Sequence, residues 1–111
     1  MVKKYIPNQG DIIFVVFNPI KGHEQQGYRP AIIISNDVFN KNTKMVIVCP
    51  ITSNEKEFPT HYNLKNTKKV NGSVLCEHIR SIDYEIRKIK YVEKASEEDF
   101  ENIKNLLDAC L

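Results

Sequence analysis

A short apolar run from Ala31 to Ile34 constrains the fold of this chain more than any other feature. Pro30 precedes the run and restricts Arg29 to extended backbone, because the proline ring clashes with an α conformation of the residue before it. A strand without polar alternation is typical of burial on both faces. We therefore expect this strand to lie in a closed barrel or against a partner chain.

Short strands are predicted along most of the chain, because β-branched and aromatic residues recur between Gly, Pro and Asn. The predicted strands are 11–17, 31–34, 45–49, 61–64, 73–79 and 88–93. Pro50 is expected to end the third strand. Ser35 and Asn36 suggest a helical turn through Phe39, and 81–87 is predicted as one irregular helical turn. Five or six short strands predict a small, strongly bent sheet or barrel.

The clearest predicted element is a C-terminal helix. Ser96 and Asp99 resemble a capping box, although Asp stands where Glu or Gln is usual. Acidic residues at 97–99 suit the positive end of a helix dipole. Apolar side chains then recur at helical spacing at Phe100, Ile103, Leu106, Leu107 and Cys110. One face of this helix should lie on the sheet, and residues 1–111 should form a single domain.

Charge is unevenly distributed along the chain, whose net charge is only +2. Residues 1–92 contain 14 Lys or Arg and 8 Asp or Glu, whereas residues 93–111 contain 2 and 6. A polyanion would be attracted to the basic part through neutralisation of its phosphates. The plainer alternative is a solvated surface of mixed charge.

Cysteine usage and hydropathy indicate a cytoplasmic protein. Cys49, Cys76 and Cys110 are odd in number and lack the spacing of a zinc site, so we expect reduced thiols. The longest apolar run is too short to span a membrane, and no signal-peptide core follows the first lysines. We expect no membrane association.

Several short motifs together resemble one known family. The chain resembles the MazF/PemK toxin endoribonucleases, which are the RNA-cutting halves of toxin–antitoxin pairs. The resemblance covers nearly the whole chain, and the combination of motifs is specific although each alone is weak. The matching segments are Gly10-Asp11-Ile12-Ile13, Asn18-Pro19, Gly22, Glu24-Gln25, Gly27-Tyr28-Arg29-Pro30-Ala31, Cys49-Pro50-Ile51-Thr52-Ser53, Phe58-Pro59, Arg80-Ser81-Ile82-Asp83 and Lys94-Ala95-Ser96.

The resemblance implies a mainly β (α+β) fold, an SH3-like barrel of the MazF/CcdB type with a C-terminal helix, assembled as a homodimer. It implies sequence-selective cleavage of single-stranded RNA, often mRNA, without a metal or other cofactor. The products would carry a 2′,3′-cyclic phosphate and a free 5′-hydroxyl. A cognate, MazE-like antitoxin would block the groove. The implied catalytic pair is Arg29 and Thr52, and both residues are present.

The chemistry of this pair agrees with what the resemblance implies. The Arg29 guanidinium can place two parallel N–H donors on phosphate oxygens, and the Thr52 hydroxyl could face the same phosphate. From the residues alone, a surface salt bridge for Arg29 and a strand-end hydrogen bond for Thr52 remain open.

A second set of residues is expected to bind RNA or support the chemistry. Glu24 and His78 are both candidates for removing the 2′-hydroxyl proton, and His78 stands where many family members have glutamine. Adjacent strand residues point to opposite faces, so Glu77 and His78 share a site only if the strand bulges or ends there. His23 and His61 are expected in exposed loops. The supporting set is Asn18, Lys21, Glu24, Ser53, Lys56, Glu77 and His78, with Lys65, Lys68 and Lys69 as further phosphate contacts.

The loop 18–28 is longer than a usual hairpin loop, and we expect it to cover or exclude the scissile nucleotide. Two other functions stay open. One is a non-catalytic SH3-like toxin that binds a protein target, as gyrase poisons of the CcdB type do. The other is an inactive family member retained only for antitoxin binding.

Overall fold

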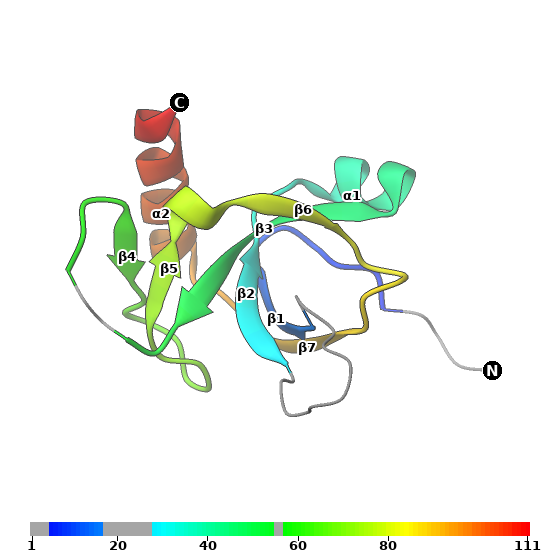
Figure 1. Ribbon diagram of the computed structural model, residues 1–111, viewed down its shortest axis with the longest axis horizontal. Helices are drawn as coiled ribbons and strands as arrows, with labels where there is room; N and C mark the ends of the chain where they lie inside the picture. The colour runs from blue at the N-terminus through cyan, green and yellow to red at the C-terminus, as the bar shows by residue number, and fades with distance from the viewer. Residues whose placement is uncertain (1–4, 17–27, 55–56) are drawn as a thin grey trace, which may run out of the picture.

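A curled antiparallel sheet organises this protein, for which a computed structural model describes residues 5–16, 28–54 and 57–111 (Figure 1). Within those residues the sheet has seven strands in the order β4-β5-β3-β2-β1-β7, with β6 paired to β3 outside this path. The strands are β1 (Asp11–Val15), β2 (Arg29–Ile33), β3 (Met45–Thr52), β4 (His61–Asn63), β5 (Ser73–Leu75), β6 (Arg80–Asp83) and β7 (Ile89–Lys94). The helices are α1 (Asp37–Thr43), α2 (Glu97–Cys110) and a short 3-10 helix, η1 (Cys76–His78).

The predicted fold class, mainly β with a C-terminal helix, is confirmed. The sheet curls strongly but does not close into a barrel in the described part of the chain. Strands β4 and β7 form the two ends of its hydrogen-bonded path. The described residues therefore form an open, bent sheet with two free end strands.

Burial on both faces of the apolar strand is confirmed. Ala31, Ile32 and Ile33 are fully buried within the single chain. Ile32 packs with Ile103 and Leu107 of α2 in one core cluster, whereas Ala31 and Ile33 belong to a second cluster inside the curl of the sheet. Helix α2 covers one face and the bent sheet covers the other, so burial of this strand requires no second chain.

Strand β3 continues through Pro50, so the prediction that this proline ends the strand is wrong. Ile34 N donates to Ile47 O at 2.8 Å, and hydrogen-bonded pairs alternate along an antiparallel ladder. Pro50 therefore pairs with Ala31 at a position that exchanges no bond with β2. On its other side β3 changes partner here, from β6 at residues 45–48 to β5 at residues 51–52, so the missing N–H is tolerated.

Two local predictions need correction. Residues 81–87 were expected to form a helical turn, but Arg80–Asp83 form β6 and pair with residues 45–48 of β3. Only the end of that segment turns, where Asp83 Oδ1 accepts from Glu85 N at 2.9 Å. The turn expected at 37–39 is a longer helix, α1, capped by Asn36, whose Oδ1 accepts from Phe39 N at 2.8 Å.

Helix α2 has the predicted cap, since Ser96 Oγ accepts from Asp99 N at 3.0 Å. The buried Asp99 carboxylate does not complete a capping box. It accepts from Tyr62 Oη at 2.7 Å and from Asn66 N at 3.0 Å, which joins α2 to β4. None of the described helices combines the length and the apolar composition needed to cross a membrane.

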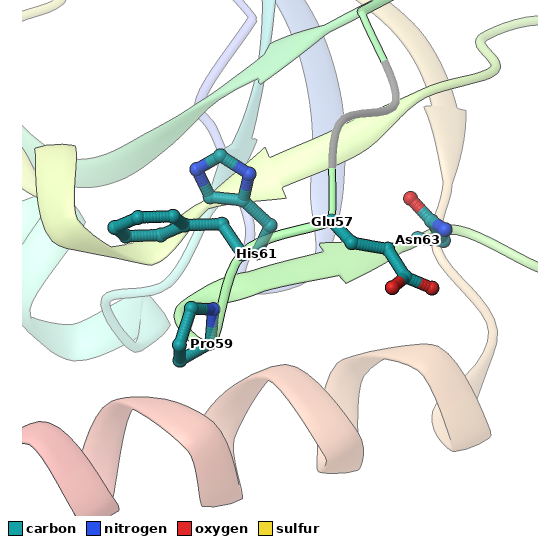
Figure 2. A pocket seen from close by; sticks show the side chains of 5 residues that line it. Glu57, Pro59, His61 and Asn63 are labelled. Atoms are coloured by element: carbon teal, nitrogen blue, oxygen red, sulfur yellow. The ribbon is translucent and has the colours of Figure 1, made fainter.

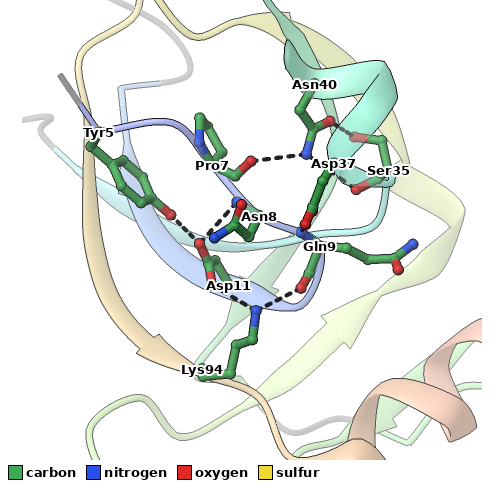
Figure 3. Close-up of polar contacts among 9 residues, drawn as sticks. All are labelled: Tyr5, Pro7, Asn8, Gln9, Asp11, Ser35, Asp37, Asn40 and Lys94. Carbon is green, nitrogen blue, oxygen red and sulfur yellow. Dashed lines mark hydrogen bonds and ion pairs between the residues drawn. The ribbon is translucent and has the colours of Figure 1, made fainter.

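A polar network fastens the first described residues to the sheet, as Figure 3 shows. Asp11 is nearly buried and accepts from Asn8 N at 3.0 Å and from Lys94 Nζ at 3.1 Å. Tyr5 also donates to Asp11, and burial, followed by this hydrogen bond, raises the pKa of Tyr5. The buried amide of Asn40 donates to Pro7 O at 3.1 Å. Asp11, a residue of the family motif, thus has a structural role.

Candidate functional site

Arg29 is the first residue of β2 and is exposed. It pairs with Val15 of β1 across the strand. No ion pair among the described residues includes it. Among residues 5–16, 28–54 and 57–111, Arg29 therefore has no salt bridge, and its side chain is exposed.

Thr52 is the last residue of β3 and is half-buried. Its Oγ1 accepts from Asn54 N at 3.1 Å, which is the strand-end hydrogen bond that the sequence left open. A hydroxyl that accepts one bond still has a proton to donate. This bond fixes the position of the oxygen without using its donor.

Arg29 and Thr52 lie at adjacent ends of the neighbouring antiparallel strands β2 and β3. The last paired residues are Ala31 and Pro50. Arg29 and Thr52 each lie two residues beyond this last pair, one at the start of β2 and the other at the end of β3. Because side chains alternate along a strand, Arg29 lies on the same face of β2 as Ala31, and Thr52 on the same face of β3 as Pro50.

This alignment extends across two further strands. Thr52 pairs with Ser73 of β5, and Ser73 pairs with Asn63 of β4. Directly paired residues share a face, so a polar row crosses four strands. On the opposite face, Ile51, Val74 and Tyr62 pack toward α2. The polar row therefore lies on the face that α2 does not cover.

Gly72 supports the end of β3 by close approach. It has φ +142°, a region that side chains disfavour, and an added Cβ would lie 2.2 Å from the carbonyl oxygen of Thr52. Only glycine allows the turn before β5 to lie this close to Thr52. The predicted Asn71-Gly72 turn thus has a direct structural link to the candidate site.

Glu77 and His78 lie in η1, because β5 ends at Leu75 rather than continuing to residue 79 as predicted. The strand ends where the sequence argument required it to end if both residues were to share a site. His78 Nε2 lies 3.8 Å from the Glu77 carboxylate, and the His78 side chain is 62% exposed. The change from strand to 3-10 helix brings the two together.

The Glu77 carboxylate is held by two side chains from the β4 region. It accepts from Thr60 Oγ1 at 2.6 Å, and its second oxygen lies 2.8 Å from His61 Nε2. Burial acts to raise the pKa of Glu77, but these hydrogen bonds outweigh it and lower the pKa. The carboxylate is therefore charged at neutral pH.

His61 is not an exposed loop residue as predicted. It begins β4, its side chain is only 15% exposed, and its ring centroid lies 5.0 Å from that of Phe58. An open pocket of about 480 Å³ is lined by Glu57, Phe58, Pro59, His61 and Asn63 (Figure 2). His61 thus links the Glu77 carboxylate to this pocket.

The remaining predicted residues divide into two groups. Ser53 is exposed directly after Thr52. The backbone amides of Lys65, Lys68 and Lys69 donate to Asp99 or Glu93. The predicted residues Asn18, Lys21, Glu24 and Lys56, together with His23, lie outside the described residues, as does nearly all of the loop 18–28.

Sequence reasoning missed Thr60, His61 and Asn63. The available signal was the motif Phe58-Pro59 immediately before a predicted strand, which places the next residues at a strand start. The alternation of β4 then sets His61 and Asn63 on one face and Tyr62 on the other. Among residues 5–16, 28–54 and 57–111, no three His, Cys, Asp or Glu side chains form a group that could hold a metal ion.

Comparison with known proteins identifies the family. Residues 8–111 match the profile of the PemK-like, MazF-like toxins of type II toxin–antitoxin systems. The endoribonuclease toxin MazF of Escherichia coli K12 is 37% identical over 87 residues, which cover 78% of each chain. The endoribonuclease MazF of Staphylococcus saprophyticus is 33% identical over 108 residues, covering 93% of this chain and 89% of that protein.

Solved structures agree with this assignment. MazF from Deinococcus radiodurans (Form-I) superposes with a TM-score of 0.84 at 32% identity, covering 96% of this chain and 97% of that chain. A MazE–MazF structure (Form-II) from the same organism gives a TM-score of 0.83 at 27% identity and covers 96% of each chain. This chain therefore belongs to the PemK/MazF family of type II toxin–antitoxin toxins.

Proposed function

We propose that this protein is a toxin endoribonuclease that cleaves single-stranded RNA by attack of the RNA's own 2′-hydroxyl. The products are a 2′,3′-cyclic phosphate and a free 5′-hydroxyl. The observation that carries the proposal is the exposed Arg29 at the start of β2 and Thr52 at the end of β3, each two residues beyond the last β2–β3 pair and on the face that α2 leaves open. A guanidinium and a hydroxyl on one face suit a single phosphate.

Arg29 acts as an electrostatic clamp in this mechanism. Its fork of N–H donors binds two oxygens of the scissile phosphate and stabilises the charge of the five-coordinate phosphorane. Thr52 donates its hydroxyl proton to the same phosphate, while Asn54 N holds its oxygen in place. Arginine stays charged at all physiological pH values, so it does not act as the base.

The base must come from another group, and His78 is the best-placed described candidate. It is exposed, and its Nε2 lies 3.8 Å from the Glu77 carboxylate. Glu77 itself already binds Thr60 and His61, so a positioning role suits it better. As the 2′-oxygen attacks phosphorus, His78 takes its proton, the bond from phosphorus to the 5′-oxygen breaks, and the departing 5′-oxygen takes a proton from solvent water.

The partners follow from the same proposal. The chain acts as a homodimer and is inhibited by a cognate antitoxin of the MazE type. The relatives seen in MazE–MazF structures support the antitoxin. Unpaired bases next to the cut confer sequence selectivity, since single-stranded RNA is read by its splayed bases.

The test is cleavage of a long unstructured RNA in EDTA, with analysis of the new ends. We expect 2′,3′-cyclic phosphates from the wild type and a rate about 10²–10³-fold lower from Arg29→Ala. Lys104→Ala, an exposed change on α2, is the matched control and should cleave normally. An Arg29→Ala enzyme as fast as wild type would contradict the clamp. No cleavage by the wild type would favour a toxin that acts on a protein target.

A further inference from the structure

The pocket beside β4 has two chemically different ends. Figure 2 shows His61 at one end, and Glu57 and Asn63 together at the other. Phe58 is 56% exposed and its ring lies beside that of His61, tilted by 40°. A flat aromatic end and a hydrogen-bonding end suit a flat ligand with a polar edge. The volume of about 480 Å³ is within the range of small-ligand sites.

The aromatic end is rigid. His61 is held by Glu77 at 2.8 Å, and Thr60 binds the same carboxylate at 2.6 Å. Such a ring keeps its orientation when a ligand stacks on it. An exposed phenylalanine beside a fixed imidazole is a platform on which an unstacked base gains binding energy.

The polar end selects what can lie there. Asn63 accepts from Ser73 Oγ through its carbonyl oxygen, so its amide N–H groups are left to face a ligand. Glu57 contributes a carboxylate, which accepts hydrogen bonds from amino groups and repels phosphate. The ligand's polar part is therefore a base edge with donors, and its phosphates lie elsewhere.

The pocket lies on the same face as the proposed catalytic pair. His61 and Asn63 share one side of β4, and Asn63 is joined through Ser73 to Thr52 by strand pairing. Two strand spacings separate Asn63 from Thr52, which is roughly 10 Å. A nucleotide next to a phosphate held at Thr52 can place its base at this distance.

We propose that this pocket binds one unstacked nucleobase of the RNA substrate, next to the scissile phosphate, and selects a base that carries an exocyclic amino group. The proposal rests on the proposed nuclease function. Phe58 and His61 supply the stacking surface, Glu57 accepts from the amino group, and Asn63 donates to a base acceptor. Uracil, which lacks an amino group, is disfavoured at this position.

The experiment scans a short RNA that contains one mapped cut site. A series of substrates carries a single abasic ribose at each position around the cut. For the wild type, kcat/KM should fall about 5-fold to 150-fold at one position, which is the effect of losing one stacked base. Phe58→Ala should show the same fall with the intact RNA and no further fall with that abasic substrate. Phe58→Tyr keeps the ring and should retain the sensitivity to the abasic ribose at that position.

Two further measurements separate the possible outcomes. Glu57→Gln should weaken discrimination against uracil at the sensitive position, measured as the ratio of kcat/KM for the two RNAs. Binding of an RNA with a 2′-deoxy sugar at the cut, measured by fluorescence anisotropy, should show the same Phe58 dependence without any cleavage. Tyr91→Ala, on β7 at the other end of the sheet, is the control and should change neither readout.

The pocket proposal is overturned if Phe58→Ala keeps the wild-type pattern of abasic sensitivity, even when the protein cleaves RNA as proposed. The nuclease proposal fails separately if the wild type cleaves no RNA in EDTA. A Phe58-dependent preference for one base in the anisotropy assay supports the pocket in either case.

Discussion

At the scale of single residues, His78 is a site where replacement by glutamine would change the available chemistry. Histidine titrates near neutrality and can take a proton, whereas glutamine cannot. If His78 removes the 2′ proton, the cleavage rate of the wild type falls toward acid pH. We expect His78→Gln to cleave about 100-fold more slowly and to lose this acid limb, as measured from initial rates across pH.

Glu77→Gln is the matched variant for this prediction. It keeps His78 and removes only the carboxylate charge that lies 3.8 Å from Nε2 of His78. The acid limb should therefore remain, because the proton acceptor is still present. A pH profile of His78→Gln that matches the wild type would exclude His78 from proton transfer.

The sequence was sufficient for some residues of the site and not for others. Arg29 lies before Pro30, so its position at the start of a strand could be predicted, whereas Thr52 was expected beyond the strand because Pro50 was expected to end it. His61 could not, because its role depends on Glu77, which is 16 residues away. Such a contact is created by the pairing of β4 with β5, and no local pattern encodes it.

At the scale of elements, the turn before β5 determines where β3 ends. Gly72→Ala would combine an unfavourable φ of +142° with a Cβ placed 2.2 Å from Thr52 O. We expect an unfolding free energy lower by about 3 kcal/mol, together with slower cleavage because Thr52 must move. Chemical denaturation and initial rates measure the two effects.

Gly10→Ala is the control for that prediction. Gly10 also has a positive φ, of +89°, but an added Cβ meets nothing closer than 3.9 Å. It should lose about 1 kcal/mol from backbone strain alone and keep normal cleavage. Equal effects of the two changes on cleavage would show that the approach of Gly72 to Thr52 is unimportant.

The segment between β4 and β5 is anchored by one carboxylate of β7. Glu93 accepts from Lys68 N at 2.9 Å and from Lys69 N and Val70 N at 2.8 Å. Burial acts to raise the pKa of Glu93, but the three backbone hydrogen bonds outweigh it and lower the pKa. Its stabilisation is therefore complete above the carboxyl pKa of the unfolded chain and is lost as pH falls through the lower, folded pKa.

Glu93→Gln should therefore be less stable than the wild type by about 2 kcal/mol at neutral pH. The difference should shrink as the pH is lowered below the unfolded value, because the wild-type carboxylate becomes protonated. Urea denaturation at several pH values measures this. Glu101→Gln, an exposed change on α2, is the control, and a pH-independent gap between wild type and Glu93→Gln would contradict the assignment.

Helices and strands could be predicted where their side-chain pattern is long and depends only on residues close in the sequence. Helix α2 has a cap and several turns of apolar spacing, and its start at Glu97 follows from Ser96. Strand β6 was missed because Arg80 and Asp83 at its ends hide the alternation that its pairing with β3 creates. Whether Pro50 can lie inside a strand depends on how β3 pairs with its partner strands. The presence of a proline therefore does not by itself predict the end of the strand.

At the scale of the whole molecule, the strong curvature of the sheet was predicted, but the closed barrel expected as one way to bury the apolar strand is not formed by the described residues. Apolar residues on both faces of β2 require cover on each side, and α2 and the curl of the sheet provide it. Closure depends on whether the end strands meet, which strand composition does not specify. The face away from α2 stays open, and it carries the polar row that ends at Arg29.

The distribution of charge should govern RNA binding by this face. Residues 93–111 are acidic and mostly form α2, so the helix repels RNA, and the remaining basic surface attracts it. The logarithm of affinity for a single strand falls with the logarithm of salt concentration, with a slope of about −0.7 for each phosphate contacted. For the wild type we expect a slope that corresponds to several phosphate contacts. Fluorescence anisotropy with a non-cleavable 2′-deoxy substrate measures this slope. Arg29→Ala should flatten the slope by about 0.7, because one phosphate contact is lost.

Lys104→Ala removes a cation from α2 instead, and its slope should match that of the wild type. The comparison is sensitive to position and not to net charge, because both variants lose one positive charge. An equal change of slope in the two variants would mean that the chain attracts RNA only through its overall charge. A change confined to Arg29→Ala would place a phosphate at the start of β2, beside the end of β3 that carries Thr52.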